Sequence, residues 1–138
     1  MSEIIQISEV FPVSAKRLFD AWLNSNEHSN FIGGDAEIRP IIGSKFSIWN
    51  GYITGTNLTI QPYGRIVQSW RSTDFPKGAL DSKLEILFEK AGNGTRITLI
   101  HTRLPAAKVK DFEKGWIDYY FKPMKKYFKK VKRVSASV

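Results

Sequence analysis

Residues 106–132 read AAKVKDFEKGWIDYYFKPMKKYFKKVK and form the longest periodic segment of the chain. Apolar side chains recur in this segment every three or four residues, the spacing that places them on one face of an α-helix. They are Val109, Phe112, Trp116, Tyr120, Met124, Phe128 and Val131. A helix with so long an apolar face must pack on another layer of the protein. Pro123 lies inside the pattern and should kink the helix or remove one of its hydrogen bonds.

The remainder of the chain predicts strands that could supply this layer. β-Branched and aromatic residues recur between turn residues, which is typical of strands. We expect strands over residues 4–11, 36–38, 45–49, 52–60, 65–70, 82–90 and 95–102. Asn50-Gly51 predicts a two-residue hairpin, and residues 91–94, Ala-Gly-Asn-Gly, predict a second one. Strands joined by such short loops must pair in antiparallel fashion.

Short helices are expected directly after the first strand. Ser14 is a suitable N-cap for a helix over residues 15–23, and residues 24–26, Asn-Ser-Asn, should end it. Residues 27–32 predict a further helical turn. The chain thus predicts an α+β fold in which a curved antiparallel sheet packs on the long C-terminal helix. We expect a single domain over residues 1–133 and a frayed tail over 134–138.

Composition excludes several classes of function. The 138 residues include no cysteine, which excludes disulfides, thiolate catalysis and cysteine-ligated metal centres. No apolar run approaches the ~20 residues of a membrane-spanning helix. The first residues lack the basic and apolar segments of a secretory signal, so we expect a cytoplasmic protein and, in the simplest case, a monomer.

The net charge of +8 is concentrated at the C-terminal end. Residues 1–105 carry a net charge of +1 and residues 106–138 carry +7, which weakens the prediction of nucleic-acid binding because that would favour a broad basic face. One interpretation of the cluster is a face that binds an acidic partner. Its candidate residues are Lys125, Lys126, Lys129 and Lys130. The other interpretation is a solvated helix end whose cations suit the helix dipole.

Four segments give the chain a family resemblance. Residues 12–22, PVSAKRLFDAW, are followed by residues 43–55, GSKFSIWNGYITG, then by residues 65–71, RIVQSWR, and by residues 115–121, GWIDYYF. In this order and spacing the chain resembles the START-like helix-grip (SRPBCC) superfamily. It is most similar to the branch typified by the C-terminal domain of the Hsp90 ATPase activator Aha1. The resemblance implies an antiparallel sheet of six or seven strands that grips the C-terminal helix, with an apolar cavity between them.

The resemblance also gives the aromatic residues a candidate role. The elements that border such a cavity would carry Trp22, Phe31, Phe46, Ile48, Tyr52, Trp70, Trp116, Tyr120 and Met124 as lining residues, and Trp49 belongs to the same aromatic set. Trp22, Trp116 and Tyr120 would form apolar walls and Tyr52 a polar tip. The alternative is that these large rings fill the interior and leave no space for a ligand.

Three functions remain open. The first is a non-enzymatic START-like module that binds a small hydrophobic molecule. The second is an interaction module that contacts an Hsp90-type chaperone, and the third is a cavity enzyme such as a cyclase or hydrolase. Catalysis has little support, because His28 and His101 have no partner at a recognisable spacing and more often serve ordinary hydrogen-bonded roles. No motif predicts a metal site or a cofactor.

Overall fold

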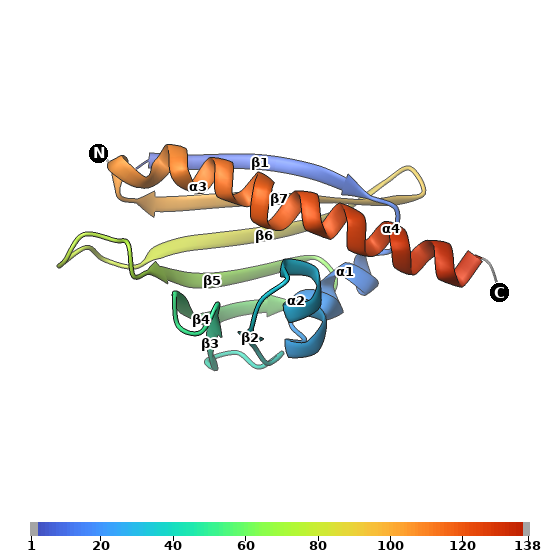
Figure 1. The fold of residues 1–138 in the computed structure, drawn as a ribbon, viewed down its shortest axis with the longest axis horizontal. Helices are drawn as coiled ribbons and strands as arrows, with labels where there is room; N and C mark the ends of the chain where they lie inside the picture. Colours follow the sequence, from blue (N-terminus) through green and yellow to red (C-terminus); the bar gives the residue numbers. More distant parts are fainter. Residues whose placement is uncertain (1–2, 137–138) are drawn as a thin grey trace.

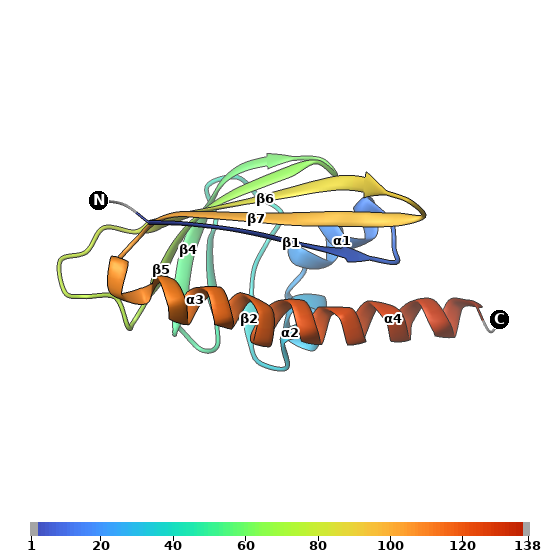
Figure 2. The same ribbon diagram turned by 90° about the horizontal axis from the view of Figure 1, so that it is seen from above.

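The computed structural model describes the backbone of residues 3–136 and the side chains of residues 4–129. Within these residues, seven strands form one antiparallel sheet in the order β1-β7-β6-β5-β4-β3-β2. The strands are β1 (Glu3–Phe11), β2 (Ala36–Glu37), β3 (Lys45–Ile48), β4 (Ile53–Gln61), β5 (Arg65–Ser72), β6 (Ser82–Ala91) and β7 (Gly94–Leu104). The C-terminal helix lies along one side of the sheet (Figures 1 and 2), so the expected α+β helix-grip fold is confirmed.

Two short helices follow the first strand, α1 (Ala15–Trp22) and α2 (Ser25–Ile32). Ser14 caps α1 as expected, because its Oγ accepts a hydrogen bond from the Arg17 N–H at 3.1 Å. The prediction for α2 was too short. Asn24, which we interpreted as part of a helix end, also caps the next helix through a bond from the Glu27 N–H to its Oδ1 at 2.9 Å.

The C-terminal helix, as we call residues 106–136, has four consecutive segments. They are the 3₁₀ turn η1 (Ala106–Lys108), α3 (Val109–Gly115), the π-helical segment η2 (Trp116–Phe121) and α4 (Lys122–Ala136). Pro123 explains the wide turn, since a proline has no N–H and its ring would crowd the carbonyl of Tyr119 four residues earlier in a regular α-helix. The chain therefore absorbs Pro123 as a π-helical turn, and the helix continues in nearly the same direction (Figure 2).

The hairpin between β3 and β4 differs from the prediction. Ile48 pairs with Ile53, so the loop has four residues, Trp49-Asn50-Gly51-Tyr52, rather than the two expected. The strands consequently end one residue earlier and begin one residue later than predicted. Both flanking aromatic residues become loop residues. The second predicted hairpin is confirmed, because Ala91 pairs with Gly94 across a two-residue turn.

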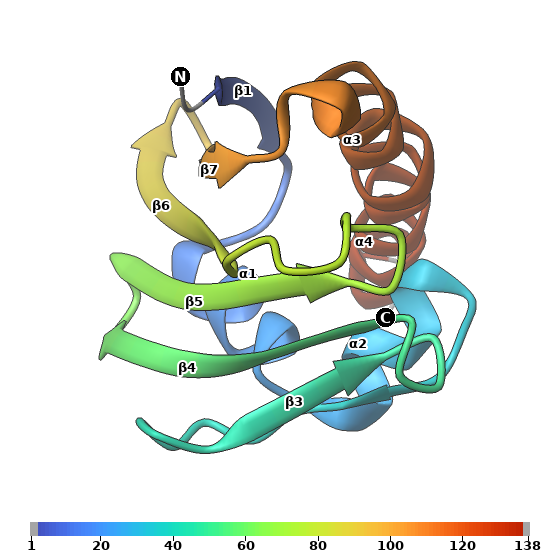
Figure 3. The same cartoon turned by 90° about the vertical axis from the view of Figure 1, so that its left-hand side faces the viewer.

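The hydrophobic core lies between the sheet and the C-terminal helix. Figure 3, which looks nearly along this helix, shows the sheet curling around it from β1 to β3. Fully buried side chains come from every layer, including Trp22 of α1, Phe31 of α2, Ile66 and Leu84 of the sheet and Phe128 of α4. The aromatic rings pack mainly in edge and tilted contacts, such as Phe31 against Phe128 with centroids 5.9 Å apart. Large rings thus fill the interior beneath α4.

Candidate functional site

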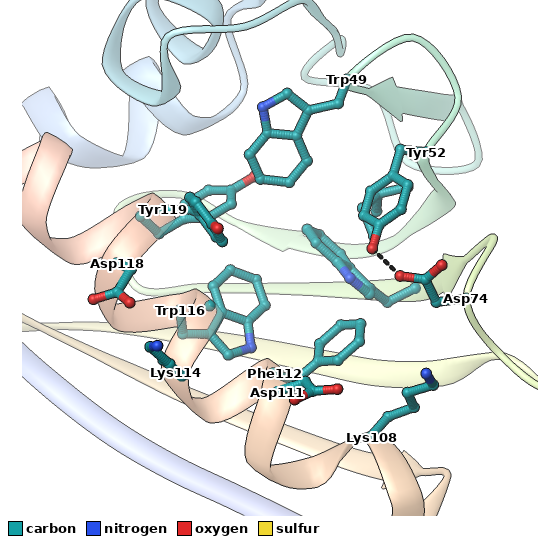
Figure 4. Close-up of a pocket in the computed structure, with 14 residues that line it drawn as sticks. Trp49, Tyr52, Asp74, Lys108, Asp111, Phe112, Lys114, Trp116, Asp118 and Tyr119 are labelled. Carbon is teal, nitrogen blue, oxygen red and sulfur yellow. Dashed lines mark hydrogen bonds between the residues drawn. The ribbon is translucent and has the colours of Figure 1, made fainter.

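A pocket of about 390 Å³ opens between the C-terminal helix and the β3–β4 loop (Figure 4). Its wall comes from that loop and the start of β4, from β5 and the loop after it, and from η1, α3 and η2. Seven of its lining residues are aromatic: Trp49, Tyr52, Trp70, Phe112, Trp116, Tyr119 and Tyr120. The pocket therefore occupies only one end of the space that the resemblance predicts.

The β3–β4 loop brings Trp49 and Tyr52 to the pocket through an uncommon backbone conformation. Trp49 and Asn50 have φ angles of 54° and 55°, and Gly51 follows with 89°. A positive φ is costly for a bulky residue such as tryptophan and is held only where surrounding contacts enforce it. Gly34 provides one such contact, because a Cβ built there would lie 2.5 Å from the Trp49 ring.

Two buried histidines fix two of the three aromatic residues that η2 contributes to the wall. His28 on α2 is fully buried, and its Nδ1 lies 2.7 Å from the carbonyl oxygen of Trp22. A carbonyl can only accept, so Nδ1 carries the proton. The Tyr120 hydroxyl then donates to the free Nε2 at 2.8 Å. Burial lowers the pKa of His28 to about 4, even though the bond to Trp22 opposes the shift.

His101 on β7 holds Trp116 in the same way. The Trp116 indole N–H donates to Nδ1 of His101 at 3.1 Å, so Nδ1 is unprotonated. Nε2 then donates to Ser82 Oγ at 2.7 Å, and the Ser82 hydroxyl donates to the carbonyl of Trp70 at 2.9 Å. Burial lowers the pKa of His101 to about 3. Both histidines are thus neutral at pH 7 with both ring nitrogens engaged, which confirms the hydrogen-bonded roles expected for them.

Polar side chains surround the open side of the pocket. The Tyr52 hydroxyl donates a hydrogen bond to the Asp74 carboxylate (Figure 4). This bond raises the pKa of Tyr52, and partial burial and the charge of Asp111 act in the same direction. The charged lining residues are Asp74, Lys108, Asp111, Lys114 and Asp118. Neither histidine belongs to the lining, so neither is placed to exchange a proton with a molecule in the pocket.

The structure divides the nine predicted cavity residues into two groups. Tyr52, Trp70, Trp116 and Tyr120 line the pocket. Five others do not line it and are at most 3% exposed in the core: Trp22, Phe31, Phe46, Ile48 and Met124. The two interpretations of the aromatic set thus apply to different parts of the molecule, with rings filling the interior in one part and leaving space in the other.

Several lining residues were missed by the sequence analysis of the pocket. Phe112 lies on the predicted helical stripe, and Tyr119 follows it after seven residues, so the spacing could have indicated that both share a helix face. Asp74 comes from an irregular loop, where no periodic signal exists. Trp49 was recognised as part of the aromatic set but not selected as a lining residue.

The candidate basic face on α4 is partly engaged within the protein. Lys125 Nζ lies 3.4 Å from Glu9 Oε1 and 5.9 Å from the centre of the Phe11 ring. Lys126 and Lys129 are exposed. The side chain of Lys130 lies outside the described residues, so its place on this face stays a prediction.

Comparison with known proteins assigns the family. The sequence model for the family described as "Activator of Hsp90 ATPase homolog 1-like protein" matches residues 12–129. The chain belongs to this family. One relative, described as "Activator of 90 kDa heat shock protein ATPase homolog" from Dictyostelium discoideum, is 30% identical over 116 residues. The match covers 83% of this chain but only 30% of that relative, so the chain corresponds to less than a third of the longer protein.

Solved structures of similar fold extend beyond the activators. An HSP90 activator from Plasmodium falciparum superposes with a TM-score of 0.78 and 24% identity, covering 86% of this chain and 90% of that chain. CalU16 from Micromonospora echinospora superposes with a TM-score of 0.79 and 19% identity, covering 99% and 83% of the two chains. At these identities the likeness establishes the shared fold alone.

Two features are absent from the described residues, a membrane-spanning helix and a cluster of metal ligands. Among residues 3–136, no helix is both long and apolar enough to cross a membrane. In the part of the chain whose side chains are described, no three histidine, aspartate or glutamate side chains gather as they would around a metal ion.

Proposed function

We propose that this chain is a START-like module that binds a small hydrophobic molecule in the pocket between the β3–β4 loop and the C-terminal helix. The supporting observation is the pocket itself. Its volume of about 390 Å³ falls in the range of known ligand sites, roughly 300–1,000 Å³, and seven aromatic residues line it. Such walls suit an apolar ligand with a few polar groups.

The arrangement of the wall favours a site that is ready before the ligand arrives. Trp116 and Tyr120 are each anchored by a buried histidine, so their rings do not have to be ordered on binding. Preorganisation of this kind raises affinity because less conformational freedom is lost. Tyr52 and Tyr119 are exposed and form the rim. We expect them to cover the ligand and to supply its polar contacts.

An amide NMR titration tests this proposal. Labelled protein is titrated with fatty acids, sterols, flavonoids and other aromatic compounds. We expect one class to give saturable shifts in residues 49–52, around Trp70 and over residues 112–120. If no class shifts these resonances, the binding proposal is wrong and the pocket is only a surface hollow.

A matched pair of tyrosine variants locates the site. Tyr119→Ala removes an exposed rim residue and should weaken binding at least several-fold. Tyr63→Ala changes another exposed tyrosine, which packs on Phe19 away from the pocket. It should leave affinity unchanged. Equal effects of the two variants would place the ligand elsewhere.

A second candidate function is contact with an Hsp90-type chaperone, which family membership and the Dictyostelium discoideum relative favour. The exposed Lys126 and Lys129 on α4 would face an acidic surface of the chaperone and accelerate association. Binding of the purified chaperone and its ATPase rate are measured at two salt concentrations. The double variant Lys126→Glu/Lys129→Glu should lose the interaction, and Lys77→Glu/Lys90→Glu, at exposed positions on other elements, should keep it. Absence of binding and of ATPase stimulation would refute this function.

A further inference from the structure

The indole N–H of Trp70 is an unsatisfied donor in the wall of the pocket. Trp70 lies on β5, is 2% exposed and lines the pocket, yet its Nε1 has no hydrogen-bond partner. Among the side chains that the structure describes, the only other buried polar atom in this state is Ser44 Oγ, which does not line this pocket. A buried donor without an acceptor is costly and calls for an explanation.

The two other fully buried indoles show that this protein normally pairs such groups. Trp22 Nε1 donates to Gln68 Oε1 at 3.4 Å, and Trp116 Nε1 donates to His101 Nδ1 at 3.1 Å. The His101 acceptor beside Trp70 is therefore already occupied. Its ring centroid lies 6.1 Å from that of Trp70, and its other nitrogen serves Ser82. The protein thus leaves a donor unpaired on a residue that lines the pocket, where a ligand could supply the acceptor.

We propose that the pocket takes a planar aromatic molecule bearing a neutral hydrogen-bond acceptor, such as an aryl ketone, and that this acceptor receives the Trp70 N–H. The inference rests on the proposed binding function and specifies its ligand class. Planarity follows from walls built of rings, including Trp70 and Trp116 with centroids 5.1 Å apart. A neutral acceptor is favoured over a carboxylate because three aspartates and only two lysines line the pocket.

The α3 side of the pocket provides the route to this donor. None of the residues of α3 is fully buried, and Phe112, its aromatic contribution to the wall, is only half-buried. By contrast, Trp116 and Tyr120 are held by their histidines. We expect the ligand to displace Phe112 and to reach the Trp70 nitrogen from that side.

A matched pair of ligands tests the inference. Fluorene and 9-fluorenone have the same tricyclic shape and differ by one carbonyl oxygen. Fluorenone should bind about five- to tenfold more tightly, the effect of one hydrogen bond formed to a buried donor. In ¹⁵N-labelled protein, fluorenone but not fluorene should move the Trp70 indole proton downfield.

A variant that keeps the ring and removes the donor completes the test. Replacing Trp70 by 3-benzothienylalanine exchanges the N–H for sulfur, so fluorenone should bind this variant only as tightly as fluorene does. The same replacement at Trp22, which does not line the pocket, should preserve the preference.

The outcomes separate this inference from the function on which it rests. Equal affinity for the two compounds, or a fluorenone preference that persists in the Trp70 variant, would overturn the inference and leave the binding function standing. Failure of both compounds to bind would overturn the ligand class. The binding function itself fails only if the wider titration panel also gives no shifts.

Discussion

The two ends of the C-terminal helix are built differently. At the α4 end, Phe128 is fully buried against Phe11 and Phe31. At the other end, α3 has no fully buried residue, and the pocket lies beside it. One continuous helix thus closes the interior at one end and leaves it open at the other.

The α4 end is also stabilised by a cluster of hydrogen-bonded polar side chains. Arg17 of α1 makes two hydrogen bonds to the Glu27 carboxylate, at 2.6 and 2.7 Å, and the Tyr127 hydroxyl donates to the same carboxylate at 2.6 Å. Burial would raise the pKa of Glu27, but these hydrogen bonds outweigh it and lower the pKa. Three helices are joined in this way. The contrast with α3 indicates that stability resides mainly at the closed end, and the proposed ligand site lies at the open end.

Mild acid should have the largest effect on stability, because it protonates the two buried histidines that bind Tyr120 and Trp116. His28 and His101 have pKa values of about 4 and about 3 when folded, against about 6.5 when unfolded. The unfolded chain therefore binds more protons as pH falls below 6.5, and stability decreases. Between pH 7 and pH 4.5 the two histidines together should cost on the order of 5 kcal/mol, measured by urea unfolding.

A histidine variant provides the control for the acid experiment. His28→Asn removes one titrating group, so the variant should lose only about half as much stability over the same interval, whatever its stability at pH 7. Glu27 begins to add to acid destabilisation only as the pH approaches its ordinary pKa of 4.5, so its contribution over this interval is small. Unchanged pH dependence in this variant would contradict the role assigned to His28.

Trp22→Ala should have the next largest effect on the free energy of unfolding. The ring is 1% exposed and contacts His28, Phe31 and Tyr120, so its removal should cost about 3–5 kcal/mol in the free energy of unfolding. Denaturant unfolding measures the loss. Trp49→Ala, at a half-buried pocket position with a positive φ, is the comparison and should cost clearly less. Similar losses would mean that the pocket end is as tightly packed as the core.

Glu27→Gln should have an intermediate effect, confined to the α4 end. It keeps the shape of the side chain but removes the charge that binds Arg17 and Tyr127, and should cost about 1–2 kcal/mol. Asp20→Asn breaks the exposed pair with Lys16 and should cost no measurable stability. If thermal unfolding shows the two variants to be equivalent, the polar cluster does not fasten the helices.

Tyr119→Ala should have the smallest effect on stability and a clear effect on binding. Its side chain is 64% exposed, so the free energy of unfolding should change by less than about 0.5 kcal/mol. Isothermal calorimetry with the strongest compound of the titration panel should show weaker binding. A large loss of stability with unaltered binding would mean that Tyr119 supports the fold and does not contact the ligand.

The sequence predicts the closed end better than the open end. The stripe that includes Met124 and Phe128 has a regular period, and Ser14 occupies a recognisable cap position, so helix and sheet are predictable from local rules. The pocket depends on details that no period encodes. Asn50-Gly51 indicates a turn but not its length, and the four-residue loop is what brings Trp49 to the helix.

Local sequence patterns also do not predict which aromatic rings fill the core. Trp22 and Trp116 carry the same signal, an aromatic residue on an apolar helix face. One is enclosed by α2 and the other borders the pocket, a difference made by the packing of distant elements. The hydrogen bonds of the histidines join residues as much as 92 positions apart and were likewise invisible in the sequence.

The π-helical turn has a consequence for how relatives of this chain can diverge. A turn closed by i→i+5 bonds holds one residue more than an α-helical turn. Deleting one residue between Trp116 and Phe121 would tighten this turn to α-helical geometry, and the ring of Pro123 would then crowd the carbonyl four residues before it. A deletion among residues 117–119 would also reduce the spacing between Trp116 and Tyr120, which bind His101 and His28, from four residues to three. A one-residue gap at this place in an alignment should therefore be accompanied by loss of the proline at position 123.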